Sequence, residues 1–355
     1  MSPMIQPSSV LDGIQSPSAR SRKRRVPPEP GSAGHRIPRD DSARGPLPKM
    51  RITWKDGSQN IMGMPVAQPL TKGSAQARDD AAEAARHLQR IDSLVRDRWN
   101  RAGWNDRGGD LTVIVNMKGM GGNAYFGEHP NGAGEMGIGV RDAAIGFKKS
   151  PAYSPSILMH EYVHGIVGTE LRGMPKHVQP YLNQREHNAV NESIADVLAL
   201  GLLDTKWRIG HEIRDGAPLR DLADPSVARW IPSVRKDAGL EEHTLSGVVS
   251  RAAVIAAESA GTMGVVDAWY AGIDKHYRNE LLHVKAPFAG RALGAWVRAT
   301  MRGAADVGGA GSALVESMRS GWEAVGLGRY ASEAQLGRTA EKPTAGKKQN
   351  VSRRT

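Results

Sequence analysis

The pattern His-Glu-x-x-His occurs once, at His160, Glu161 and His164, inside an apolar stretch from 156 to 167. On an α-helix, residues four apart lie about 40° apart around the axis, so both imidazoles point the same way. Two neutral imidazole nitrogens on one face can bind a single Zn²⁺, and Glu161 beside them can take a proton from a water on the metal. The spacing therefore predicts a metal site with hydrolytic chemistry, as in zinc peptidases.

The residues around this pattern predict a buried helix. Ser154 and Pro155 read as an N-cap followed by proline at the first helical position. Apolar residues then occur on every side of the predicted helix. A short motif of this kind also arises by chance on helix surfaces, but buried His and Glu side chains need partners, and a metal supplies them.

A catalytic zinc site needs a third protein ligand, and Glu192, 28 residues after His164, is the candidate. It opens a second apolar helix. Asp196 lies four residues later on the same face, where its carboxylate could accept the free ring N–H of a ligating histidine. The alternative is that Glu192 is an ordinary acidic residue near a helix N-terminus, stabilised by the helix dipole.

Together these residues resemble the thermolysin family of zinc metallopeptidases. The resemblance covers about residues 70 to 327, in the family's order, and extends to segments 123–126, 219–225, 243–247 and 321–327. It implies an α+β, two-lobe fold. A mixed sheet and helix N-terminal lobe would precede a helical C-terminal lobe, with the zinc cleft between them.

The resemblance also implies roles for individual residues. The zinc ligands would be His160, His164 and Glu192, and Glu161 would be the general base. His243 would stabilise the developing oxyanion. The residues that would position the peptide are Asn123, Ala124 and Arg220.

Some positions depart from the family pattern. Leu245 stands where the family usually has Asn. The carboxylate that orients His243 stays open among Asp237, Glu241 and Glu242, and the family's transition-state tyrosine has only a weak counterpart in Tyr181. Ser156 and Leu203 occupy positions of calcium-binding carboxylates. Since a hard cation needs several oxygen ligands, Zn²⁺ is the expected cofactor and structural calcium is not predicted.

The net charge of +11 belongs mainly to the ends of the chain. Residues 1–50 hold nine basic and four acidic residues, and residues 331–355 hold six and two. Such charge is typical of a solvated, disordered arm, so nucleic acid is not the expected partner; a peptide or protein substrate is. The absence of Cys excludes disulfides and thiol catalysis.

The sequence gives little on localisation. No stretch approaches the roughly 18 apolar residues of a membrane span. The first 25 residues lack the apolar core of a secretory signal peptide. We expect either export by a non-classical bacterial route or a cytoplasmic location.

Patterning along the chain divides it into five segments. Residues 1–50 are predicted to be a disordered basic segment, and 51–75 either a prosegment remnant or a linker packed on the body. The N-terminal lobe, including the zinc helix, takes 76–168, the helical lobe takes 169–330, and 331–355 form a disordered basic tail. Periodicity predicts helices over 79–99, 246–260, 290–302 and 312–325, and strands over 111–115 and 135–140.

Two functions of different classes follow. The first is a zinc metalloendopeptidase that prefers apolar residues just after the cut, as the resemblance implies. The alternative keeps the zinc fold with impaired catalysis, as a binding module or a narrow-specificity bacterial effector. Leu245 and the missing tyrosine favour the alternative, whereas the intact Glu161 argues against it.

Overall fold

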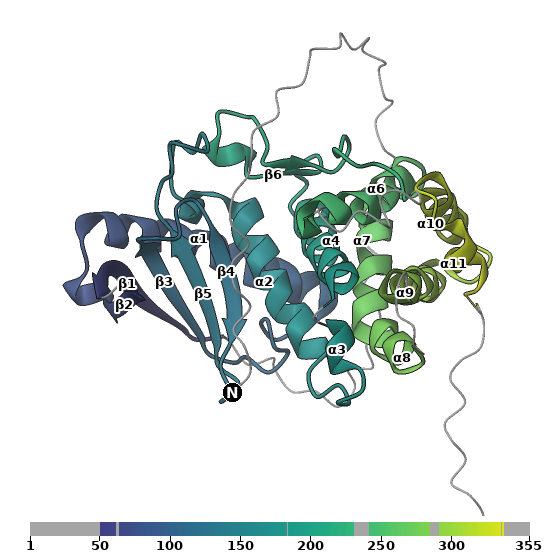
Figure 1. Ribbon diagram of the computed structural model, residues 1–355, viewed down its shortest axis with the longest axis horizontal. Coiled ribbons are helices and arrows are strands. Elements are labelled where there is room, and N and C mark those ends of the chain that lie inside the picture. The colour runs from purple at the N-terminus through teal and green to yellow at the C-terminus, as the bar shows by residue number, and fades with distance from the viewer. Residues whose placement is uncertain are drawn as a thin grey trace, which may run out of the picture.

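The computed structural model describes residues 50–61, 64–182, 184–230, 241–284, 291–334 and 336. In these residues, a sheet with one long helix precedes a group of helices, and helix α2 lies between the sheet and the other helices (Figure 1). The α+β prediction, with a mixed lobe followed by a helical lobe, is confirmed. No helix in the described part is long and apolar enough to cross a membrane.

The sheet has five strands in the order β2-β1-β3-β5-β4. Its centre is β3 (Leu111–Met117), which runs parallel to β1 (Ile52–Ile61) and to β5 (Gly134–Gly139). Strands β2 (Met64–Pro69) and β4 (Ala124–Glu128) complete the two sides as antiparallel neighbours. A strand between two parallel neighbours is normally buried on both faces, and β3 is buried along most of its length.

Helix α1 (Ala75–Trp99) contains the predicted amphipathic stretch and begins four residues before it. Its N-terminus is fixed by Ser74, whose side chain accepts a hydrogen bond from the Ala77 amide. Its buried apolar residues recur at helical spacing, and the helix packs against β3 and α2; these residues are Ala77, Ala81, Ala84, Leu88, Ile91, Val95 and Trp99.

The second lobe is helical, and the predicted helices within it are confirmed with longer or shifted ends. Two short strands, β6 (Arg208–Ile209) and β7 (Arg220–Asp221), pair beside it. Helix α2 (Pro155–Glu170) lies between the sheet and this lobe. The helices that follow it are α3 (Gln179–Leu182), α4 (Arg185–Leu202), α6 (Glu242–Ala260), α7 (Thr262–Ala271), a π-helical turn (Gly272–His276), α8 (Tyr277–Leu282), α9 (Arg291–Gly308), α10 (Ala313–Ala324) and α11 (Gly328–Ser332).

The predicted segments 51–75 and 331–355 both contain described residues. The stretch 51–75 supplies β1 and β2, so this part of the chain is built into the sheet. Helix α11 ends at Ser332, and Leu336 packs against the core, both beyond the predicted lobe boundary at residue 330. Most of the two predicted tails, residues 1–49, 335 and 337–355, lies outside the described residues.

The two lobes are joined by buried contacts between the end of α1 and α7. Arg98 Nε donates to Asp267 Oδ1 at 2.9 Å, and the Asp267 side chain is 2% exposed. The Trp99 ring stacks on Tyr270 with 4.2 Å between ring centroids. Stacked aromatic rings and a buried ion pair hold the lobes in a fixed relation, which in turn fixes the elements that lie between them.

Candidate metal centre

Helix α2 begins as the sequence predicts and carries both histidines of the motif. Ser154 is its N-cap and accepts from the Ile157 amide, and Pro155 is its first residue. The helix is buried on nearly all sides, which leaves His160 only 4% exposed and Glu161 only 8% exposed. Polar side chains at this depth require partners, and the structure supplies them from helix α4 and its neighbours.

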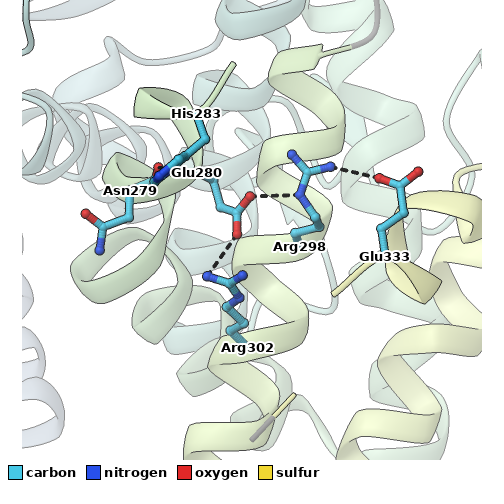
Figure 2. Close-up of a pocket in the computed structure, with 6 residues that line it drawn as sticks. All are labelled: Asn279, Glu280, His283, Arg298, Arg302 and Glu333. Atoms are coloured by element: carbon cyan, nitrogen blue, oxygen red, sulfur yellow. Dashed lines mark hydrogen bonds and ion pairs between the residues drawn. The ribbon is translucent and has the colours of Figure 1, made fainter. Parts of the chain in front are cut away.

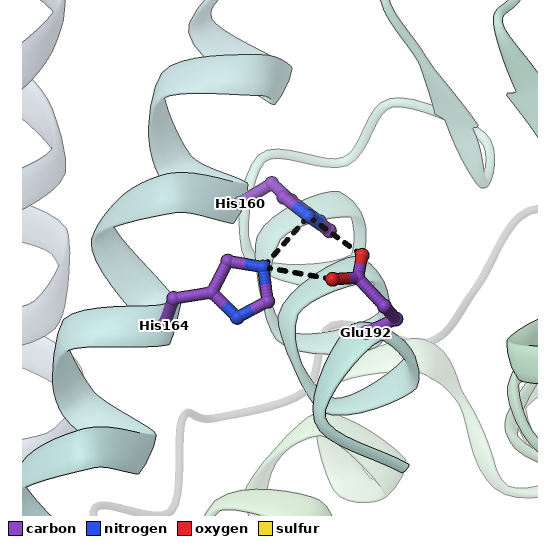
Figure 3. Close-up of side chains that lie close together, drawn as sticks. All are labelled: His160, His164 and Glu192. Atoms are coloured by element: carbon purple, nitrogen blue, oxygen red, sulfur yellow. Dashed lines mark hydrogen bonds and ion pairs between the residues drawn. The ribbon is translucent and has the colours of Figure 1, made fainter. Parts of the chain in front are cut away.

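The three predicted zinc ligands converge, with His160 and His164 on α2 facing Glu192 on α4 (Figure 3). The Nε2 atoms of the two histidines lie 3.0 Å apart. Glu192 Oε2 is 3.2 Å from His160 Nε2, and Glu192 Oε1 is 3.4 Å from His164 Nε2. Among the described residues, this is the one group of His, Cys, Asp or Glu side chains close enough to share a metal ion.

These distances fit a tetrahedral zinc ion. With zinc–ligand bonds of about 2.0–2.1 Å, two ligands of a tetrahedron lie about 3.3 Å apart, close to the three spacings observed. Two imidazoles and one carboxylate are also a known donor set of catalytic zinc sites. Glu192 Oε2 is buried and accepts no well-directed hydrogen bond, although two imidazole nitrogens lie 3.2 Å from it. A carboxylate oxygen that binds a metal cation would lack a directed hydrogen bond in this way.

Asp196 lies behind the first histidine, as its spacing from Glu192 predicts. Its Oδ1 is 2.9 Å from His160 Nδ1, and the side chain is fully buried. Arg220 on β7 donates to both of its oxygens, from Nη2 at 2.6 Å and from Nε at 3.2 Å. Arg220 is thereby joined to the metal centre through Asp196, while its predicted contact with the peptide stays a prediction.

The charges around His160 shift the pKa values of this group. Burial opposes ionisation of Asp196, but Arg220 and His160 outweigh it and hold the Asp196 pKa at about 2. Burial likewise lowers the pKa of His160, but Asp196 and Glu192 outweigh it and raise this pKa to about 10. The field at this point therefore favours a positive charge, which a metal cation would supply.

Asn191 is a site residue that the sequence analysis missed. Its Oδ1 lies 3.3 Å from His164 Nδ1, the ring nitrogen on the far side from Glu192. Asn191 therefore contacts the Nδ1 nitrogen of His164, as Asp196 contacts the Nδ1 nitrogen of His160. Adjacent residues of a helix lie about 100° apart, so the spacing rule that predicts Asp196 from Glu192 gives no signal for Asn191.

His243 lies on the first turn of α6 and points toward the triad. Its Nε2 is 3.2 Å from Glu192 Oε2, and its side chain is 39% exposed, so it borders both the metal centre and solvent. Of the carboxylates considered for orienting it, Glu242 accepts from Asn188 at 2.9 Å, and Asp237 lies outside the described residues. The side chain of Tyr181 also lies outside the described residues.

Leu245 is buried next to Ala189 in a small apolar cluster that Val227 and Trp230 cover. Its side chain is 1% exposed. The residue that departs from the family pattern thus packs inside the helical lobe.

Asn123 and Ala124, predicted to bind the peptide, lie at the start of β4 and outside the triad. Strand β4 pairs with β5 on one side and has no strand on its other side in the described part of the chain. It also packs on α2, where a Cβ added at Gly165 would lie 2.6 Å from the Phe126 ring. An open strand edge is therefore held next to the helix that carries the two histidines.

A separate polar pocket of about 340 Å³ lies among α8, α9 and α11 (Figure 2). Glu280 pairs in it with Arg298 at 2.7 Å and with Arg302 at 3.0 Å, and Arg298 also pairs with Glu333 at 3.1 Å. The two arginines and two glutamates balance in charge. We read this pocket as a structural ion-pair network.

Comparisons with known proteins point in one direction. Residues 181–327 match the family model described as thermolysin metallopeptidase, alpha-helical domain. The chain is 25% identical over 260 residues to Bacillolysin of Brevibacillus brevis, in an alignment that covers 70% of this chain and 46% of that protein. The chain thus spans about half the length of this curated relative.

One solved structure gives the same indication for the fold. It is the precursor of protealysin, a metalloproteinase from Serratia proteamaculans, which matches with a TM-score of 0.57 at 18% identity. The match covers 80% of this chain and 90% of that chain. At this level of identity the similarity concerns the fold alone.

Proposed function

We propose that this chain, which matches the thermolysin metallopeptidase family model over residues 181–327, is a zinc-dependent endopeptidase that hydrolyses internal peptide bonds. The observation that carries the proposal is the convergence of His160, His164 and Glu192, with Glu161 directly after the first ligand. The preference for apolar residues after the cut, implied by the resemblance, is part of the proposal.

The protein residues have distinct tasks in this reaction. When bound, zinc would polarise the scissile carbonyl and acidify water in its open position. Glu161 takes the proton of the attacking water and passes it to the leaving amine. His243, which borders the metal centre and solvent, donates a hydrogen bond to the oxygen on which negative charge develops. Asp196 and Asn191 keep the two ligand imidazoles in orientation.

Cleavage of unfolded casein by zinc-loaded protein tests this proposal. We expect Glu161→Gln to keep one zinc and to lose activity by about 10²–10⁴-fold, the range for removal of a general base. His160→Ala should lose both zinc and activity, because a ligand is gone. Glu316→Gln, the same chemical change on an exposed residue of α10, should behave as wild type.

Zinc content and intact mass are recorded for each protein alongside the cleavage products. Near-wild-type turnover in Glu161→Gln would disprove the role of this base. If wild type holds one zinc and cuts no protein in a panel of unfolded substrates, the binding-module alternative replaces the peptidase.

A further inference from the structure

The face of α2 that carries the zinc ligands continues beyond them. Gly168 lies one turn after His164, and Arg172 follows two residues after α2 ends at Glu170. Gly168 is exposed, and a Cβ added there would meet no atom within 4 Å. Next to the second histidine, this face therefore presents open space.

That open space ends at an ion pair. Arg172 Nη2 lies 2.6 Å from Glu128 Oε1, and Glu128 is the last residue of the edge strand β4. The backbone of the Arg172 turn is itself held, because Arg278 of α8 donates to the Arg172 carbonyl at 2.6 Å and to the Glu170 carbonyl at 3.3 Å. The pair therefore joins the end of β4 to the turn that follows α2.

The length of β4 gives the distance from Ala124, which is predicted to bind the peptide, to this pair. Four residues separate Ala124 from Glu128, which is about 13 Å at the rise of a strand. An extended peptide lying along β4 would cover this distance with about four residues.

We propose that the Arg172–Glu128 pair closes one end of the substrate site and limits the peptide to about four residues on that side of the cleaved bond. This inference rests on the proposed peptidase function and adds a substrate class to it. The favoured substrates are peptides, or exposed chain ends, that terminate before this pair. Either kind of chain end finds an opposite charge there, an ammonium at Glu128 or a carboxylate at Arg172.

The pair restricts long peptides without excluding them. The Arg172 and Glu128 side chains are 37% and 27% exposed, and exposed ion pairs are worth little. A longer peptide must break the pair to continue past it. We therefore expect a loss of about two- to fivefold for long peptides, the factor that corresponds to one such pair.

A length series of peptides tests the proposal. A fluorescent apolar hexapeptide is extended at either end by one to six residues of Gly and Ala. Values of kcat/KM are measured with the zinc-loaded wild type, and binding is measured by anisotropy with zinc-loaded Glu161→Gln. The same series is run on Arg172→Ala and Glu128→Gln. The control, Arg51→Ala, removes an exposed ion pair to Asp110 at the start of β1.

We expect extension at one end to lower kcat/KM and affinity two- to fivefold in wild type and in Arg51→Ala, and to have no effect in the other two variants. Equal values for all lengths at both ends in wild type would overturn the proposal, as would a loss that persists in Arg172→Ala and Glu128→Gln. A failure of the peptidase function would be seen separately, as no cleavage of any peptide, while binding still reports the length dependence.

Discussion

Asp196→Asn is the most specific test of the candidate metal centre, because it changes a residue that contacts His160 and is not itself one of the three candidate ligands. The carboxylate lies 2.9 Å from His160 Nδ1 and accepts two hydrogen bonds from Arg220. Asparagine has the same size, but it carries no charge and has one acceptor oxygen in place of two. The ring of His160 would lose the partner that fixes its tautomer, and Arg220 would lose its counter-charge.

The structure sets the expected magnitudes. Loss of an oriented carboxylate behind a zinc-ligating histidine lowers metal affinity by about 10–100-fold, or about 1.4–2.7 kcal/mol. Breaking a fully buried ion pair costs about 3–5 kcal/mol of unfolding free energy. The Arg220 side chain is 24% exposed and asparagine still accepts one hydrogen bond, so we expect a smaller loss of about 2 kcal/mol.

Zinc affinity is measured by competition with a chromogenic chelator at neutral pH, and stability by urea unfolding of the metal-free protein. Asp267→Asn is the matched control, because its carboxylate is equally buried and also paired with an arginine, Arg98, but at the lobe junction. The control should lose similar stability and keep wild-type zinc affinity. Wild-type affinity in Asp196→Asn, or an equal loss of affinity in both variants, would refute the reasoning.

Two further predictions concern stability. Burial lowers the pKa of His187 to about 4 from 6.5, so the unfolded chain binds a proton between these values that the native protein does not. The unfolding free energy of the wild type should therefore fall by about 2 kcal/mol between pH 7 and pH 5. His187→Phe can keep the stack on Tyr277 but has no group that titrates. In urea titrations, the fall in its unfolding free energy over the same pH range should be smaller by about 2 kcal/mol. Gly165→Ala should lower the unfolding free energy by about 1–2 kcal/mol, because a Cβ there meets the Phe126 ring at 2.6 Å and this clash outweighs the gain in helix propensity. Gly168→Ala, whose Cβ would meet no atom within 4 Å, should instead raise the unfolding free energy by up to about 1 kcal/mol. Equal urea midpoints for the two variants would contradict this difference.

The sequence was most informative where function depends on residues close together in the chain. The spacing of His160 and His164 puts two imidazoles on one helix face by geometry alone, and Asp196 follows Glu192 by the same rule. The N-cap at Ser154 is equally local. These features were predicted because the helix repeat converts their sequence spacing directly into spatial proximity.

Contacts between distant segments could not be predicted in this way. The bond from Arg220 to Asp196 joins β7 to α4, and no periodicity relates the two positions. Residues 51–75, for which a prosegment remnant or a linker packed on the body is predicted, supply two strands that the patterning did not predict, because β1 pairs with β3 across about 50 residues of chain that include α1. Strand pairing at such a separation depends on the whole fold, which local patterning does not encode.

The position of the candidate metal ligands on α2 depends on these distant contacts, because side chains from other segments bind both ends of the helix. At its N-terminus, Glu212 accepts hydrogen bonds from the hydroxyls of Ser154 at 2.8 Å and Ser156 at 2.9 Å. At its C-terminus, Arg101 pairs with Glu170, and Arg278 binds the carbonyls that follow. Contacts from three other segments oppose rotation or sliding of α2 and hold both imidazoles at the observed separation. The motif therefore specifies which atoms are candidates to bind a metal, and the distant ionic contacts specify where those atoms are held.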